Sequence, residues 1–234
     1  MPEASPADHP GPLVFVADLD EPVLGSDDAH HLSRVLRLRP GDPLTVGDGA
    51  GRWRPARFGP DATVESTGPV EEVPAPRPAL TVAFALVKGD KPELVVQKLT
   101  ELGVDRIVPF RAERSVVRWE DAKAAKAVAR LRAVATGAAM QCHRPHLPVV
   151  EDVTDLLTLV AQGAALADRH GAPPSLDVPM VAVGPEGGWS GAERRLDAPR
   201  VALGGHVLRS ETAALTAGAL LAALREGLVV SPPG

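Results

Sequence analysis

Hydrophobic positions follow two different patterns along the chain. In the first seventy residues, short apolar segments alternate with turn residues, and two of the turns contain Gly-Asp pairs. This pattern is typical of a small β-barrel. The strands are predicted at residues 13–16, 43–46, 52–58 and 63–67. A helix is predicted over residues 26–38, with its buried side supplied by Leu32, Val35, Leu36 and Leu38.

Beyond residue 80, apolar strands alternate with amphipathic helices, which predicts a parallel sheet with helices on its faces. The strands are expected at residues 80–87, 106–110, 164–167, 179–183 and 200–203. Helices are expected at residues 92–102, 122–140 and 213–225. In the first of these, the apolar residues are Leu94, Val95, Leu99 and Leu102. The last helix is almost entirely Ala and Leu, so we expect it to be buried over most of its circumference or packed against a second subunit.

A proline-rich segment at residues 74–78 separates the two patterns. Proline lacks the amide donor and restricts the residue before it, so regular structure is excluded there. We therefore predict an N-terminal domain at residues 1–73, a linker at residues 74–79 and an α/β domain at residues 80–229.

Composition narrows the class of protein. The 234 residues are 44% hydrophobic and 24% charged, which is ordinary for a globular protein, while aromatic residues make up only 3%. No apolar run approaches the roughly 20 residues that span a bilayer, and the first residues lack the layout of a signal peptide. The single cysteine, Cys142, fits a reducing compartment. We therefore expect a cytoplasmic protein without membrane attachment.

The net charge of −5 hides a local excess of positive charge. Residues 34–57 contain six arginines and two aspartates, a net charge of +4. Such a cluster is typical of a surface that contacts nucleic-acid phosphates. A solvated basic face fits the charge pattern equally well.

Two glycine-rich turns are the candidate ligand-binding segments. In residues 181–190 (VAVGPEGGWS), an apolar strand runs into a glycine-rich turn, and Ser190 is placed to cap the next helix. Glycines let a ligand approach the backbone at the carboxyl end of a parallel strand. The spacing matches neither the dinucleotide fingerprint nor the P-loop. A tight turn without a ligand is the alternative.

Residues 201–213 (VALGGHVLRSETA) repeat this arrangement before the last helix. Arg209 and Glu211 stand at the start of that helix, where polar side chains either cap the helix or face a substrate. Capping is the usual role of Ser210 or Glu211.

Together, residues 184–190 (GPEGGWS) and 203–215 (LGGHVLRSETAAL) resemble the RsmE family of SPOUT methyltransferases. The resemblance extends over nearly the whole chain. It includes residues 31–42 (HLSRVLRLRPGD), 88–103 (KGDKPELVVQKLTELG), 113–117 (ERSVV) and 141–148 (QCHRPHLP). One departure is Met140, which stands where the family usually has an acidic residue.

The resemblance implies a PUA-like N-terminal β-barrel that binds RNA and a trefoil-knotted SPOUT domain that binds S-adenosylmethionine. It implies a homodimer that methylates N3 of a uridine in 16S ribosomal RNA of the small subunit. The implied cofactor-binding residues are Leu166, Gly184, Gly188, Leu203, Gly204 and Leu208. We assign RNA binding to Arg34, Arg37, Arg39, Arg52 and Arg54.

For catalysis, we expect Arg209 to stabilise the developing uracil anion, because arginine keeps its charge and cannot act as the base. Glu211 is expected to orient that arginine or to accept the N3 proton. The target base must be unpaired or flipped out, since N3 lies on the Watson–Crick edge.

Three other functions are considered. A SPOUT enzyme that methylates the ribose 2′-hydroxyl would share the glycine turns but is not expected to carry residues 31–42. A non-catalytic RNA-binding factor would need the arginines but no cofactor cavity. A metal site at Cys142, His143 and His146 lacks a second ligand pair at zinc spacing, so no metal is expected.

Overall fold

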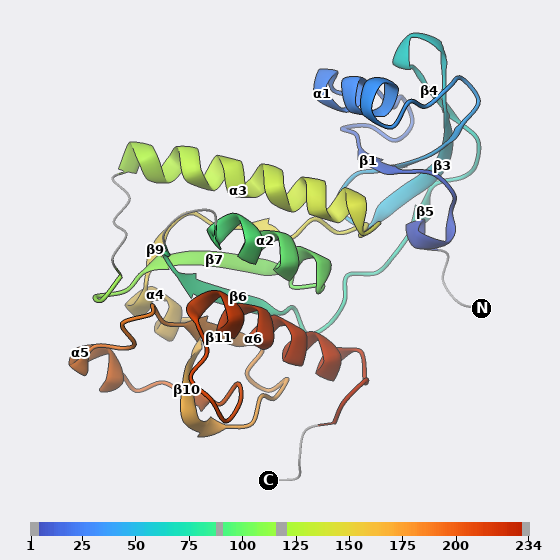
Figure 1. Ribbon diagram of the computed structural model, residues 1–234. Helices are drawn as coiled ribbons and strands as arrows, with labels where there is room; N and C mark the ends of the chain where they lie inside the picture. The colour runs from blue at the N-terminus through green and yellow to red at the C-terminus, as the bar shows by residue number, and fades with distance from the viewer. Residues whose placement is uncertain (1–4, 88–90, 116–120, 231–234) are drawn as a thin grey trace. The chain divides into compact units, whose positions relative to one another are not determined.

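The computed structural model describes residues 5–87, 91–115 and 121–230 (Figure 1). Its contacts divide the chain into two compact units. The N-terminal unit comprises Met1–Ala75 and Thr136–Leu147, and the C-terminal unit comprises Pro76–Ala135 and Pro148–Gly234. No local pattern of residues predicted that Thr136–Leu147 belongs with the N-terminal unit.

The N-terminal unit contains a five-stranded sheet in the order β1-β2-β3-β4, with β5 also paired to β3. Its strands are β1 (Leu13–Phe15), β2 (Pro43–Gly47), β3 (Arg52–Phe58), β4 (Val64–Ser66) and β5 (Glu71–Glu72). The β1–β2 pair is parallel, and the other pairs are antiparallel. Two 3₁₀ turns accompany it, η1 (Pro6–Asp8) and η3 (Pro60–Ala62). All four predicted strands are confirmed to within one or two residues.

The predicted helix over residues 26–38 is shorter and less regular than expected. The helix α1 (Ser26–His30) continues into a π-helical turn, η2 (His31–Val35). Leu32 is fully buried, but the Val35 and Leu36 residues are 61% and 46% exposed, so their predicted burial is wrong. A π turn has hydrogen bonds that span five residues rather than four, so it holds more residues per turn than an α-helix, which rotates the residues that follow it away from the core.

The end of the longest helix, α3 (Asp121–Gln141), and the chain that follows it pack within the N-terminal unit. Met140 contacts the hydrophobic core around Leu32 and Leu44. The Leu147 amide donates a hydrogen bond to the Gly49 carbonyl at 2.8 Å. An apolar residue at position 140 therefore has a packing role in this unit.

The C-terminal unit contains a seven-stranded sheet in the order β12-β10-β11-β6-β7-β8, with β9 also paired to β7. Its strands are β6 (Thr81–Ala85), β7 (Arg106–Arg111), β8 (Val149–Val150), β9 (Thr154–Asp155), β10 (Ala165–Ala172), β11 (Met180–Val183) and β12 (Arg200–Val201). Every pair is parallel, which confirms the predicted parallel sheet. The helices are α2 (Lys91–Glu101), α3 (Asp121–Gln141), α4 (Leu156–Ala161), α5 (Gly191–Arg194) and α6 (Ser210–Arg225).

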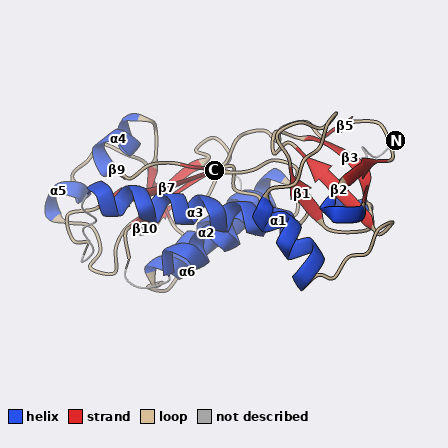
Figure 2. Cartoon of the chain, turned by 90° about the horizontal axis from the view of Figure 1, so that it is seen from above, coloured by secondary structure: helices blue, strands red, loops and turns tan. Residues whose placement is uncertain are grey.

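Alternating residues of the sheet enter two separate cores. On β6, Val82 and Phe84 pack with residues of α2 and α6, while Ala83 and Ala85 pack with residues of α4. Figure 2 shows α2 and α6 on one side of the strands and α4 on the other. Both faces of the sheet are thus covered, which explains why its strands read as continuous apolar runs.

Helices α2 and α6 approach each other closely. A Cβ atom on Gly218 of α6 would lie 2.5 Å from the Leu99 side chain of α2, so a larger residue would have to displace that leucine. On α2, Val95 and Leu99 are buried as expected, whereas Leu94 is exposed, contrary to the prediction. The reason is that Val96, rather than Leu94, completes the buried stripe.

Helix α6 begins at Ser210, three residues earlier than predicted. One face is buried in the core, and Leu215, Leu220 and Leu224 are half-buried. In the part of the chain that the structure describes, no helix has the length and apolar character needed to cross a membrane.

Arg225 anchors the end of α6 to the sheet. Its side chain is only 5% exposed and forms an ion pair with Asp105. The same guanidinium donates a hydrogen bond to the Gly103 carbonyl at 2.8 Å. Removing a buried cation from such a set costs more than removing an exposed one.

We predict that Arg225→Met lowers the free energy of unfolding by about 2–4 kcal/mol, because the acceptors at Asp105 and Gly103 lose a buried donor. Lys98→Met is the matched control, since it removes the more exposed Lys98–Glu101 pair on α2. That control should cost at most about 1 kcal/mol. Urea unfolding measures both, and equal losses in the two variants would contradict the anchoring role.

Candidate functional site

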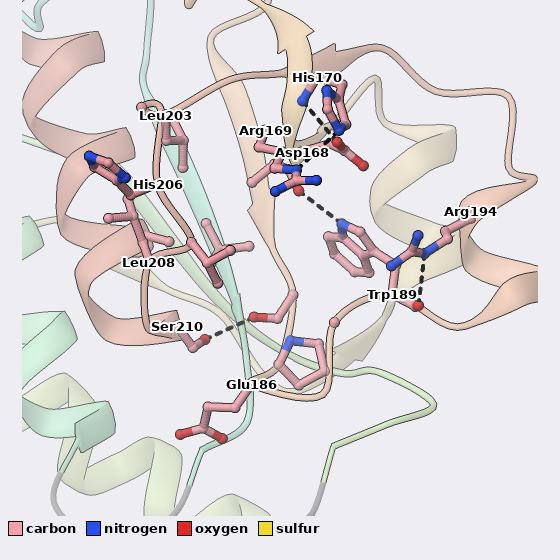
Figure 3. A pocket seen from close by; sticks show the side chains of 18 residues that line it. Asp168, Arg169, His170, Glu186, Trp189, Arg194, Leu203, His206, Leu208 and Ser210 are labelled. Carbon is pink, nitrogen blue, oxygen red and sulfur yellow. Dashed lines mark hydrogen bonds between the residues drawn. The ribbon is translucent and has the colours of Figure 1, made fainter.

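A cavity of about 410 Å³ opens in the C-terminal unit. Three segments line it, one from β10, one after β11 and one before α6 (Figure 3). The lining residues are Ala167, Asp168, Arg169, His170, Val183, Gly184, Pro185, Glu186, Gly188, Trp189, Arg194, Leu203, Gly204, His206, Val207, Leu208, Ser210 and Ala213. The volume falls within the range of about 300–1,000 Å³ that is usual for small-molecule sites.

The first glycine turn follows β11 directly and is built against Trp189. A Cβ atom on Gly184 would lie 3.1 Å from the Trp189 indole, so any larger residue would displace that ring. Gly188 has φ +65°, a left-handed conformation that glycine adopts without strain. Backbone at this turn therefore reaches the cavity without side chains in the way.

The end of this turn is fixed by the start of α5. Ser190 caps α5 as predicted and forms a capping box with Glu193. The buried Glu193 carboxylate also accepts a hydrogen bond from the Glu113 amide at 2.9 Å. One carboxylate thus joins the loop after β7 to the loop after β11.

Trp189 forms one wall of the cavity. Its indole N–H donates a hydrogen bond to the Ala167 carbonyl at 2.9 Å, as Figure 3 shows. The indole also stacks on Phe110, with ring centroids 6.2 Å apart. The indole therefore connects β10 to the turn after β11.

The second glycine turn lies between β12 and α6 and is tied to the first. The Ser210 hydroxyl donates a hydrogen bond to the Gly184 carbonyl at 2.9 Å (Figure 3). The N-cap position of α6 is Arg209, not Ser210, and the Arg209 side chain makes no capping hydrogen bond. Gly204 has φ +149° with open space where a Cβ would stand.

Five of the six expected cofactor-binding residues line the cavity: Gly184, Gly188, Leu203, Gly204 and Leu208. Their role in binding stays a prediction. Leu166 does not line it, because its side chain is fully buried in the core beside Leu159 and Ala182. The pleat of β10 directs Leu166 into that core.

Arg209 and Glu211 lie at the start of α6, outside the cavity lining. Arg209 is exposed, and its side chain forms no hydrogen bond or ion pair with any described residue. The Glu211 carboxylate contacts the Lys91 ammonium at 3.3 Å. That ammonium also contacts Glu186 at 2.8 Å, and Glu186 belongs to the cavity lining.

These contacts shift two pKa values. Hydrogen bonds to Glu186 and Glu211 raise the pKa of Lys91 above its usual value. Partial burial acts to raise the pKa of Glu211. A backbone hydrogen bond, the Lys91 ammonium and the Arg209 charge outweigh that effect, so the pKa of Glu211 lies below its usual value. Both groups therefore stay charged near neutral pH.

Three polar residues of β10 that the sequence analysis did not single out also line the cavity: Asp168, Arg169 and His170. Arg169 Nε donates a hydrogen bond to His170 Nε2 at 3.0 Å, and the His170 amide donates one to the Asp168 carboxylate at 3.0 Å. The sequence did contain a signal for them, because these three polar residues directly follow the apolar run at residues 164–167.

The expected RNA-binding arginines differ in their surroundings. Arg34, Arg37, Arg39 and Arg52 are exposed in the N-terminal unit. The Arg54 side chain is only 17% exposed and donates hydrogen bonds to the carbonyls of Leu19 and Gly68. Arg54 therefore holds two loops together, and we leave it out of the proposed contact surface.

Within residues 5–87, 91–115 and 121–230, no group of three or more His, Cys, Asp or Glu side chains is arranged to hold a metal ion. The half-buried Cys142 thiol donates a hydrogen bond to the Ala139 carbonyl at 3.7 Å.

The sequence matches two protein families. Residues 74–222 match the RNA methyltransferase domain, and residues 24–59 match the RNA methyltransferase PUA domain. The ribosomal RNA small subunit methyltransferase E of Mycobacterium bovis is 36% identical over 221 residues, with 83% of each chain covered. The chain belongs to the ribosomal RNA small subunit methyltransferase E family. The Bacillus subtilis member is 32% identical, with 82% of this chain and 85% of its own covered.

Solved structures of methyltransferases are also similar to this chain. A Legionella pneumophila methyltransferase, Lpg2936, in complex with bound S-adenosylmethionine has a TM-score of 0.80 and 28% identity, covering 92% of this chain and 98% of its own. A Neisseria gonorrhoeae ribosomal RNA small subunit methyltransferase E bound to S-adenosylmethionine has a TM-score of 0.75 and 29% identity, covering 91% and 97%. The expected resemblance to the RsmE family of SPOUT methyltransferases is confirmed, with a PUA-like domain before an α/β domain.

Proposed function

We propose that this chain transfers a methyl group from S-adenosylmethionine to N3 of a uridine in 16S ribosomal RNA of the small ribosomal subunit. The observation that carries the proposal is the cavity between two glycine turns, in a chain whose relatives are small-subunit ribosomal RNA methyltransferases. Two structural neighbours of 28% and 29% identity are bound to this cofactor.

The residues present fit S-adenosylmethionine. The molecule carries a carboxylate, an ammonium and a sulfonium. The cavity lining carries charges of both signs, with a negative charge on Asp168 and positive charges on Arg169 and Arg194. Exposed backbone at Gly188 and Gly204 leaves room for close approach. These glycines, with Gly184, Leu203 and Leu208, are the proposed cofactor-binding residues.

Catalysis is proposed to depend mainly on positioning. S-adenosylmethionine supplies an electrophilic methyl group, and the chain must hold the uracil N3 in line with it. Arg209 is the proposed anion stabiliser, because its guanidinium is exposed and makes no ion pair with a described residue. Glu211 is paired with Lys91 and has a lowered pKa, so we assign it to orientation rather than to proton acceptance.

The N-terminal unit is the proposed RNA-binding part, acting through Arg34, Arg37, Arg39 and Arg52. We keep residues 1–73 as the proposed RNA-binding domain, 74–79 as the linker and 80–229 as the catalytic domain, with the trefoil knot that the family implies. A homodimer is also proposed. It is supported by the three half-buried leucines of α6, which would lose further contact with water in a dimer.

Cofactor binding is tested at Gly204. Gly204→Val places a β-branched side chain at φ +149° beside the cavity, so we predict at least about 100-fold weaker binding of S-adenosylmethionine, or about 2.7 kcal/mol. Gly205→Ala is the control, because open space surrounds that position. Calorimetric titration measures both variants. Parent-like affinity in Gly204→Val would show that the cofactor binds elsewhere.

Catalysis is tested at Arg209. Arg209→Ala should slow methyl transfer on the order of 10²-fold, the scale of one lost electrostatic stabiliser, while cofactor affinity stays near that of the parent. Part of the rate should return at higher pH, because uracil N3 then loses its proton unaided. Arg195→Ala removes another exposed arginine of the same unit and should have no effect. Near-parent turnover in Arg209→Ala would refute the assignment.

RNA binding is tested by salt dependence. The double variant Arg34→Ala/Arg37→Ala should weaken RNA binding and reduce the slope of log K against log salt by about 0.7–0.9 per lost phosphate contact. Cofactor affinity should not change. The control removes two exposed lysines of α3, Lys123→Ala/Lys126→Ala. Filter binding over a salt series measures the slopes, and an unchanged slope in the arginine variant would exclude this surface.

A further inference from the structure

Lys91 links two separate segments around the cavity. It is the first residue of α2, and its ammonium contacts Glu186 at 2.8 Å and Glu211 at 3.3 Å. Glu186 lies in the glycine turn after β11, and Glu211 lies in the first turn of α6. In Figure 3, the Glu186 side chain points away from Asp168 and His170.

The two carboxylates need a counterion. Both contact the same ammonium, so without Lys91 they would repel each other at the join between the turn and the helix. One oxygen of Glu211, Oε2, is buried and has no hydrogen-bond partner among the described residues, so the contact of this carboxylate with Lys91 is made through Oε1. Arg209 is the other cation whose charge acts on Glu211.

Arg209 is therefore the alternative partner of Glu211. The Glu211 carboxylate contacts Lys91, and the Arg209 guanidinium forms no ion pair with a described residue. If Lys91 lost its charge, the Glu211 carboxylate would lose its ion pair. It would then be free to pair with Arg209, which stands two residues before Glu211 in the chain. A guanidinium paired with a carboxylate no longer presents its full charge to a substrate anion.

We propose that Lys91 is a positioning residue for methyl transfer, which holds Glu186 and Glu211 in place and so keeps Arg209 available to the substrate. This assignment rests on the proposed function. Lys91 itself does not line the cavity and is not assigned a contact with cofactor or RNA.

A purely structural ion pair is the alternative role. The Lys91 side chain is 32% exposed, and exposed pairs contribute little to folding stability. Lys91→Met should therefore fold, and its thermal unfolding should resemble that of Lys98→Met, which breaks another lysine–glutamate pair of α2. A change in activity alone would then separate the two roles.

The test measures transfer of labelled methyl groups from S-adenosylmethionine to small ribosomal subunits that lack the modification. Lys91→Met should lower kcat at least about 10-fold, the size of a modest loss of transition-state stabilisation. Lys91→Arg, which keeps the charge, should stay within about 3-fold of the parent, and Lys98→Met should match the parent.

A double-mutant cycle tests whether Lys91 acts through Glu211. Glu211→Gln and Lys91→Met should each lower kcat, and the double variant should be no slower than the slower single variant. Residues that act as a unit give such non-additive effects, whereas independent roles would multiply. Multiplied losses would overturn the proposed route through Glu211.

The pH profile supplies a readout that a structural pair would not move. The charged groups around Glu211 are Lys91 of α2, Glu186 of the glycine turn and Arg209 before α6. In Lys91→Met, protonation of Glu211 at acid pH removes the negative charge that would pair with Arg209. The loss of kcat in Lys91→Met relative to the parent should therefore shrink as the pH falls.

The possible outcomes separate this assignment from the proposed function. With an active parent, Lys91→Met as active as Lys98→Met, or a ratio of kcat between Lys91→Met and the parent that does not change with pH, would overturn the role of Lys91 alone. A parent that binds no S-adenosylmethionine and transfers no methyl group would overturn the proposed function, and the Lys91 assignment with it.

Discussion

The parallel alignment of β10, β11 and β12 determines where the cavity forms. Because all three strands run in the same direction, their carboxyl ends lie at one edge of the sheet, and the segments that follow gather there. The Ser210–Gly184 hydrogen bond then ties the start of α6 to the turn after β11. This bond joins the two segments directly, in addition to their connection through the sheet.

Backbone exposure in these turns depends on buried supports around them. Trp189 fills the space beside Gly184, and its indole N–H donates a hydrogen bond to the Ala167 carbonyl. The Glu193 carboxylate accepts hydrogen bonds from the backbone amides of both Glu113 and Ser190. Such supports restrict the positions that the turns can adopt, which is what precise placement of a reacting group requires. The charged groups at the start of α6 therefore stand on a fixed frame.

The sequence predicted the features that depend on local patterns. The parallel sheet followed from apolar strands alternating with helices, and Ser190 was identified as a cap from its position after a glycine turn. Both predictions depend on neighbours within a few residues. The π turn after His30 was not predictable in this way, so Val35 and Leu36 were wrongly expected in the core.

Contacts between residues far apart in the chain could not be predicted from the sequence. Lys91 meets carboxylates that lie 95 and 120 residues further along the chain, and no local pattern marks such a contact. Arg54 looks like any other arginine of the basic segment, yet it bonds to the Leu19 and Gly68 carbonyls. Leu166 follows the apolar pattern of its strand, and only the pleat of β10 in three dimensions shows that it faces the core rather than the cavity.

The proposed methylation of N3 of a uridine in small-subunit ribosomal RNA is tested by mass spectrometry of nucleosides and RNA fragments from cells with and without the protein. Cells without the protein should lack one N3-methyluridine in their 16S ribosomal RNA, and restoring the protein should return it. An unchanged set of methylated nucleosides, or the loss of a ribose 2′-O-methyl group instead, would exclude the proposed activity.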